Sequence, residues 1–317
     1  DRAFLDGCVD HILSINRAGI EVQKGNFSSW EENRRRQDAF ELAENDRLSH
    51  EIGALHAAAR RSADWSARTE RSKIGEHAAN RGFIGAQSAR MMKRAKANER
   101  RQENAAREKE QLLKNLERSD TLKITPLRHH ANVLAEAREL TISYGERTVC
   151  GPLDFVLRQG ERVALMGPNG SGKSSIVKLL AGEAIPHTGT LRLASGLIVS
   201  YVPQDTSYLT GTVLDYARTC GLDETLFLTI LRKLDFPREQ FEKDMRDFSG
   251  GQKKKALLAK SLSERAHIYV WDEPLNFVDV LSRMQVRDLL LAAAPAMLLV
   301  EHDHAFIDEV TTRRIPL

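Results

Sequence analysis

The chain has 317 residues, of which 41% are hydrophobic and 29% charged, and its formal net charge is +3. This is a globular balance with a polar excess, long enough for about two domains, and its small total charge requires any nucleic-acid binding to come from a local basic patch. The three cysteines include no C-x-x-C pair, which disfavours a disulfide framework and a zinc site and favours a reducing, cytoplasmic location. The longest apolar stretch, 289–300, is too short to cross a membrane and has a proline in its middle, so it predicts a helix end, a turn and a buried strand.

Residues 1–30 alternate short apolar runs with turns and predict two strands that complete a fold. The sequence DRAFLD at 1–6 is repeated in similar form as DHAFID at 303–308. Two similar sequences so far apart in the chain indicate two related structural units. The second copy follows His302, and we expect the equivalent histidine to stand directly before Asp1.

Residues 31–118 contain no proline and are rich in Ala, Glu, Arg and Lys, which predicts helix. Ser28 and Glu31 fit a capping box at the start of the first helix. Leu48, Ile52 and the positions that continue their spacing form one apolar face, and a second apolar run covers 91–116. Glycines within 72–86 break the pattern, so we expect an antiparallel helical hairpin with its tip at about 66–89.

The far end of this predicted hairpin is basic. Between residues 60 and 101 there are twelve Lys and Arg residues against four acidic ones. Trp65 and Phe83 lie near the turn, where aromatic rings are able to stack on bases. A run of charged residues is usually the solvent-exposed face of a helix. Here the excess of positive charge lies at the end of a narrow two-helix arm, which favours contact with RNA.

From residue 121 onwards, strand-like and helix-like segments alternate, which predicts an α/β domain. The segment 167–174, GPNGSGKS, fits the phosphate-binding pattern G-x-x-x-x-G-K-S between an apolar strand and a helix. Lys173 would reach the β- and γ-phosphates of a nucleotide, and Ser174 would bind Mg²⁺.

Five further features lie at strand ends or before a helix, and each of them alone has a plain structural explanation. The run 267–274, HIYVWDEP, is a strand-like segment followed by two acidic residues. Asp272 would hold a metal, mostly through water, and Glu273 would act as the general base for an attacking water. FSGGQ at 248–252 precedes a helix and would offer N–H groups to an anion. The others are Gln204, which would reach Mg²⁺ or the water, His302 at the end of a strand, and Tyr144, whose ring would stack on adenine.

The order and spacing of these motifs closely resemble the nucleotide-binding domain of the ABC ATPase superfamily over residues 137–317. The residues that the resemblance assigns to nucleotide binding are Tyr144, Gly167, Pro168, Asn169, Gly170, Ser171, Gly172, Lys173, Ser174, Ser175, Ser249, Gly250, Gly251 and Gln252. It assigns Glu273, His302 and Gln204 to catalysis, and Ser174, Gln204 and Asp272 to the metal, with ATP and Mg²⁺ as the ligands.

GNFSSW at 25–30 and DEPLNFVD at 272–279 are similar to ABC-F proteins, which carry two such domains joined by a helical linker. The resemblance implies that 1–30 is the end of a first ATPase domain, 31–120 the linker and 121–317 the second ATPase domain, in a chain truncated at its N-terminus. The expected fold is therefore α/β, an ABC-type P-loop ATPase domain preceded by a long antiparallel helical hairpin.

The linker and LNFVDVLSRMQ at 275–285 resemble the Lsa- and Vga-type antibiotic-resistance proteins. This implies an ATPase that binds the ribosomal exit site, contacts 23S rRNA and P-site tRNA through the linker, and displaces lincosamides, pleuromutilins and streptogramin A. Its other partner would be the missing first domain in the same chain, with no membrane. The alternatives are a housekeeping ABC-F translation factor and the ATPase subunit of a membrane transporter, and the basic arm disfavours the latter.

Overall fold

The computed structural model describes residues 2–16, 19–71 and 122–317, together with residues 93, 97, 100, 101, 104 and 105. The chain divides into two compact units, residues 8–118 and residues 119–317 with 1–7, which we call the helical unit and the α/β unit. Within the described ranges, no helix is long and apolar enough to cross a membrane.

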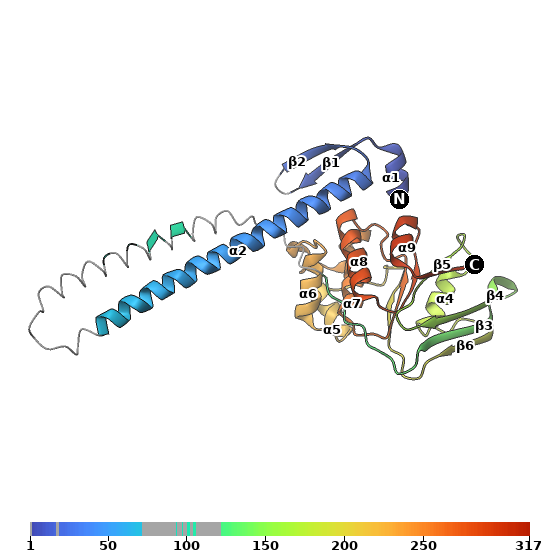
Figure 1. The fold of residues 1–317 in the computed structure, drawn as a ribbon. Coiled ribbons are helices and arrows are strands. Elements are labelled where there is room, and N and C mark those ends of the chain that lie inside the picture. The colour runs from blue at the N-terminus through green and yellow to red at the C-terminus, as the bar shows by residue number, and fades with distance from the viewer. Residues whose placement is uncertain are drawn as a thin grey trace, which may run out of the picture. The chain divides into compact units, whose positions relative to one another are not determined.

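The described residues of the helical unit include a two-stranded antiparallel sheet and a long helix (Figure 1). The elements are β1 (His11–Asn16), β2 (Gly19–Lys24) and α2 (Phe27–Arg71). The two predicted strands are confirmed. Leu13 and Val22 face each other across the sheet and, with Ile20, leave an apolar face that is 57–66% exposed.

Helix α2 has 45 residues and is therefore about 68 Å long. It begins at Phe27, so the predicted capping box from Ser28 to Glu31 is wrong. Asn26 caps the helix instead, because its Oδ1 accepts a hydrogen bond from Ser29 N at 3.1 Å. Leu48 and Ile52 are buried as the predicted apolar face requires, whereas most of the predicted tip and second helix lies outside the described residues.

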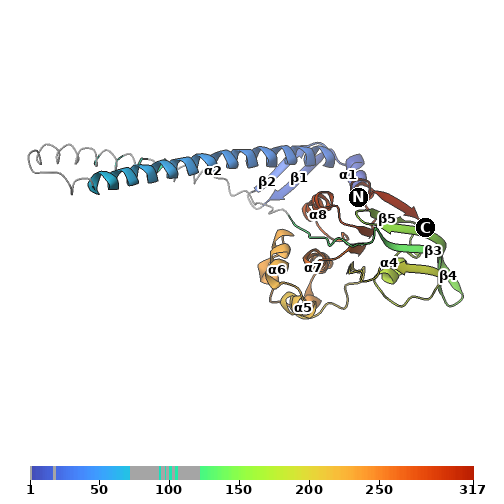
Figure 2. The same cartoon turned by 60° about the horizontal axis from the view of Figure 1, so that its bottom comes forward.

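The α/β unit is built on a five-stranded parallel sheet of order β10-β5-β9-β8-β7 and a three-stranded antiparallel sheet of order β4-β3-β6 (Figures 1 and 2). The strands are β3 (Val133–Tyr144), β4 (Arg147–Arg158), β5 (Arg162–Met166), β6 (His187–Leu193), β7 (Val199–Val202), β8 (Ile268–Asp272), β9 (Met297–Val300) and β10 (Arg313–Pro316). The helices are α1 (Arg2–Cys8), α4 (Lys173–Leu180), α5 (Val213–Thr219), α6 (Glu224–Lys233), η2 (Arg238–Gln240), η3 (Met245–Asp247), α7 (Gly250–Ser263), α8 (Val280–Ala293) and α9 (His304–Val310).

Both faces of the parallel sheet are covered, so β8 is buried throughout. Its side chains nevertheless alternate between two cores. Ile268 and Val270 pack with α4 and the antiparallel sheet, whereas Tyr269 and Trp271 pack with the helices of the other face. Asp272, the last residue of this strand, is therefore enclosed on both sides, and this burial affects the pKa of its carboxyl group.

The apolar stretch at 289–300 folds as its sequence predicts. Helix α8 ends at Ala293, Ala294 turns with a φ of 43°, and β9 begins at Met297 with all four residues buried. Strand β9 pairs with β5 on one side and with β8 on the other, so His302 follows the central strand of the sheet.

The two copies of the repeated phrase both form helices of seven residues, α1 and α9. Their surroundings differ. Phe306 of α9 is fully buried and the strand that follows it, β10, pairs in parallel with β5. Phe4 occupies the equivalent position in α1 and is 68% exposed.

Candidate functional site

The predicted phosphate-binding loop joins the end of β5 to the start of α4, as its sequence requires. Gly172 is the residue before the helix and has a φ of 91° and a ψ of 6°, a left-handed conformation that favours glycine. A Cβ at this position would lie 2.6 Å from the Cβ of Cys150 in β4. Glycine is thus required here for its backbone angle and for the close approach of a neighbouring strand.

Lys173 is the first residue of α4, and its side chain folds back over the loop. Its Nζ donates hydrogen bonds to the carbonyl oxygens of Gly167 at 2.8 Å and Pro168 at 2.9 Å. The residue is only 7% exposed. The ammonium group is therefore held at the concave side of a glycine-rich loop that leads into a helix N-terminus, the arrangement that binds phosphate groups.

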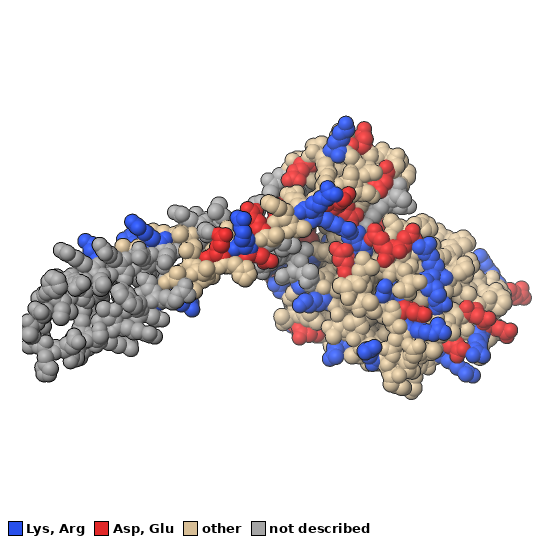
Figure 3. All heavy atoms as spheres, viewed as in Figure 1, with Lys and Arg blue, Asp and Glu red and all other residues tan. Residues whose placement is uncertain are grey.

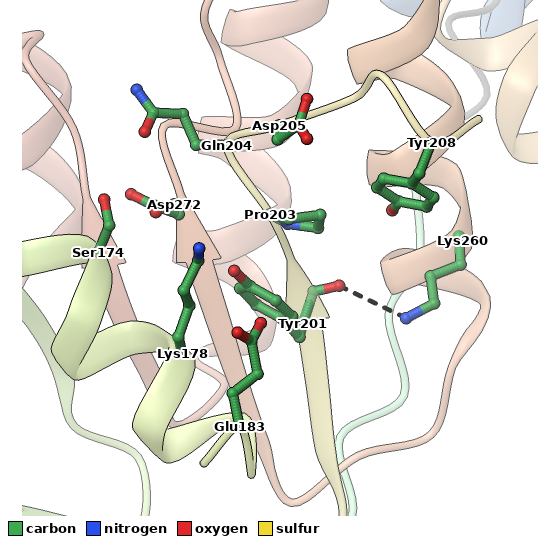
Figure 4. A pocket seen from close by; sticks show the side chains of 10 residues that line it. All are labelled: Ser174, Lys178, Glu183, Tyr201, Pro203, Gln204, Asp205, Tyr208, Lys260 and Asp272. Atoms are coloured by element: carbon green, nitrogen blue, oxygen red, sulfur yellow. Dashed lines mark hydrogen bonds between the residues drawn. The ribbon is translucent and has the colours of Figure 1, made fainter. Parts of the chain in front are cut away.

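The three residues predicted to bind a metal line one pocket of about 430 Å³ (Figure 4). Ser174 comes from α4, Gln204 follows β7 and Asp272 ends β8. Lys178, one turn beyond Ser174 in α4, reaches into the same pocket. The carboxyl ends of adjacent parallel strands thus bring together residues that are far apart in the sequence.

Asp272 is fully buried, and neither of its carboxylate oxygens has a hydrogen-bond partner among the described residues. Burial raises the pKa of this carboxyl group, and the nearby Ser174 hydroxyl offsets part of the rise. An enclosed carboxylate with two unsatisfied oxygens, beside a serine hydroxyl and an amide, fits a hard divalent cation such as Mg²⁺.

Glu273 is the centre of a group of side chains from three strand ends. Its Oε1 lies 3.1 Å from His302 Nε2, and its Oε2 accepts a hydrogen bond of 2.9 Å from Gln204 Nε2. The backbone of Glu273 has a φ of 49°, which is strained for a residue with a side chain. The three predicted catalytic residues are thus in direct contact.

Two further residues hold this group in place, and the sequence interpretation missed both. Asn276 donates from Nδ2 to Glu273 Oε2 at 2.6 Å. Glu301 is 6% exposed, and its two oxygens accept from the backbone N–H groups of Leu275 at 2.8 Å and His302 at 3.1 Å. Burial raises the pKa of Glu301. Asn276 lies three residues after Glu273, and Glu301 lies directly before His302. Their closeness in the sequence to two predicted catalytic residues could have identified them as candidates for the site.

The FSGGQ motif lies elsewhere, because none of the residues 249–252 is among those that line the pocket. Ser249 caps α7: its Oγ accepts from Gln252 N at 3.3 Å, while Gln252 Oε1 accepts from Ser249 N at 2.9 Å. Gly250 and Gly251 lie against Phe277. The motif forms a capped helix start, and anion binding there stays a prediction.

Tyr144 lies close to the phosphate-binding loop. Its hydroxyl group is 3.0 Å from Ser175 Oγ, and the side chain is 47% exposed. This position leaves the ring partly open to solvent beside α4. The predicted stacking on adenine stays a prediction.

Comparison with known proteins agrees with this geometry. Residues 150–276 match a protein-family model described as ABC transporter. Over these residues the chain is therefore similar to an ABC ATPase domain, in agreement with its α/β fold and parallel sheet.

Three curated relatives align with nearly the whole chain. The ATP-binding protein Uup of Caulobacter vibrioides is 29% identical over 100% of this chain and 50% of its own length. The energy-dependent translational throttle protein EttA of Haemophilus influenzae is 25% identical over 98% and 52%, and the ribosome protection protein VmlR of Bacillus subtilis is 25% identical over 99% and 58%. The chain thus has homologues in the ABC-F family and spans about half their length.

Proposed function

We propose that the chain is the second half of an ABC-F ribosomal protection protein that hydrolyses ATP and displaces antibiotics from the ribosome. The observation that carries the ATPase part is the contact of Glu273 with Gln204 and His302 beside the pocket that Asp272 and Ser174 line. The similarity to VmlR, a ribosome protection protein, supports the cellular role.

In this proposal Lys173 and the loop before α4 bind the phosphates of ATP. Glu273 accepts the proton of the attacking water, while Gln204 and His302 orient that carboxylate and the water. Ser174, Asp272 and Gln204 would hold Mg²⁺, which neutralises phosphate charge when bound.

We further propose that residues 1–30 end a first ATPase domain, that 31–120 form a helical hairpin, and that 121–317 form the second ATPase domain. The repeated phrase with its two seven-residue helices and the length of the relatives support this division. Each ATP would then lie between the phosphate-binding loop of one domain and the FSGGQ-type motif of the other. ATP turnover of this chain alone is expected to be low and to rise with protein concentration as two copies pair.

The first experiment is ATP turnover of the wild type and of Glu273→Gln. In the variant the amide oxygen is able to accept from Gln204 and Asn276, while the amide nitrogen is able to donate to His302, so the network survives. Loss of the general base should reduce turnover by about 10²- to 10⁴-fold with ATP binding unchanged. The exposed Glu242, changed to Gln, is the control. Equal turnover of the wild type and Glu273→Gln would refute the assignment of the base.

The ribosomal role is tested separately, by sedimentation with ribosomes and by minimum inhibitory concentrations of a lincosamide and a pleuromutilin. Deletion of residues 75–85 should abolish any rise in these concentrations, and binding through the basic arm should weaken as salt increases. The similarity to EttA favours a second candidate, a translation factor without a role in resistance. Ribosome binding without a rise in inhibitory concentration would support that candidate.

A further inference from the structure

Lys254 is a buried lysine in the first turns of α7, the helix that begins directly after Ser249. It is 3% exposed. Burial lowers its pKa, and the nearby carboxylates of Asp272 and Glu273 partly offset this effect. Its neighbours in the helix differ, since Lys253 is partly exposed and Lys255 pairs with Asp279 at 2.6 Å. An enclosed ammonium group is unfavourable unless its protons are satisfied, so its acceptors are informative.

Both acceptors of Lys254 are main-chain carbonyls at strand ends. Its Nζ donates to Pro203 O at 3.0 Å and to Asp272 O at 3.4 Å. Pro203 directly precedes Gln204, and Asp272 directly precedes Glu273. The lysine therefore contacts the backbone one peptide unit before each of two side chains that touch each other.

These contacts close a ring. Lys254 joins the two strand ends through their carbonyl oxygens, and the 2.9 Å hydrogen bond from Gln204 Nε2 to Glu273 Oε2 joins them again through side chains. The strained φ of Glu273 means that its orientation depends on such external support. A shift of α7, to which the FSGGQ motif belongs, would move both peptide units together.

We propose that Lys254 is a positioning residue for ATP hydrolysis, which holds the main chain before Gln204 and Glu273 and links both side chains to α7, the helix that begins at Gly250. This inference rests on the proposed ATPase function.

The test compares Lys254→Met with Lys253→Met in the whole chain. Both substitutions exchange a lysine for methionine at adjacent positions of α7, and only the first removes the two hydrogen bonds. We expect Lys254→Met to lower kcat for ATP about ten-fold, because small displacements of catalytic groups slow the reaction, with KM unchanged because Lys173 and its loop are intact. Lys253→Met should match the wild type. Equal kcat values for Lys254→Met and Lys253→Met would overturn the inference.

Two more variants separate positioning from folding. Lys254→Arg keeps the charge and the donors and should restore most of the lost kcat, whereas equal losses in the arginine and methionine variants would contradict the proposal. If Lys254→Met does not fold, Lys254→Leu, which also lacks a hydrogen-bond donor, replaces it, and a wild-type kcat there would also overturn the proposal. Combining Lys254→Met with Gln204→Ala should give less than the sum of the two single effects.

Amide hydrogen exchange tests the role of Lys254 without a measurement of ATP hydrolysis. Segments 203–206 and 272–276 should exchange faster in Lys254→Met than in Lys253→Met, and equal exchange would count against Lys254. If the wild type hydrolyses no ATP, the proposed ATPase fails, and the exchange rates still decide whether Lys254 holds these two segments.

Discussion

The substitution Gly172→Ala tests the geometry of the phosphate-binding loop. Alanine would have to adopt a φ of 91°, and its Cβ would lie 2.6 Å from the Cβ of Cys150. Neither partner is free to move away. Gly172 is the N-cap of α4, and Cys150 is paired with Ile142 in the antiparallel sheet.

The expected loss has two parts. The left-handed backbone costs an alanine about 1–2 kcal/mol. Forcing an extra carbon into a packed contact costs about 1–3 kcal/mol more. Gly172→Ala should therefore lower the free energy of unfolding of the α/β unit by about 2–5 kcal/mol.

Gly145→Ala is the matched control, because Gly145 has a φ of 61° and an added Cβ there meets nothing within 4 Å. It should lose only the backbone part, about 1–2 kcal/mol. Guanidinium unfolding measures both values. Cys150→Gly removes the atom that the new Cβ would meet, so the loss caused by Gly172→Ala, measured relative to the single variant Cys150→Gly, should approach the control. Equal losses for Gly172→Ala and Gly145→Ala would refute the steric argument.

Three further predictions concern the core, the pH dependence and the site. Trp271 is fully buried and donates from Nε1 to Ser261 Oγ at 2.8 Å, so Trp271→Phe should reduce the free energy of unfolding by about 1–3 kcal/mol in guanidinium titrations, and no loss would contradict this. Burial and the neighbouring His129 and His130 hold the pKa of His267 below 6.5. The unfolded chain therefore binds more protons just below pH 6.5, so stability should fall on acidification through that window, and His267→Asn should flatten the slope. Asn276→Ala removes a 2.6 Å hydrogen bond to Glu273 and should lower kcat roughly ten-fold with KM for ATP unchanged, as steady-state kinetics would report.

The sequence predicted which residues end the strands of the parallel sheet, because apolar runs followed by Gln204, Asp272 and His302 are local patterns. It did not predict the contacts that Glu273 makes. Those contacts depend on the positive φ of Glu273 and on the turn that returns Asn276 to its carboxylate. Both are set by tertiary packing and are not visible in residue spacing.

The start of α2 shows a different limit. Asn26 and Ser28 both belong to the residue types that cap helices, and Glu31 made Ser28 the better match to the capping pattern. The structure uses Asn26, whose side chain reaches Ser29 N. Asn26 and Ser28 have similar intrinsic preferences for the N-cap position. Which of them starts the helix depends on the path of the preceding chain, which here turns at Gly25 with a φ of 131°.

The sheet of β1 and β2 has a consequence for handling the protein. In the described part of the chain it has two strands, and Leu13, Ile20 and Val22 are 57–66% exposed on one face. An open strand edge beside an apolar face is a template for edge-to-edge association. Concentrated preparations of this chain should therefore self-associate through β1 and β2, and a lysine in place of Leu13 should keep them monodisperse.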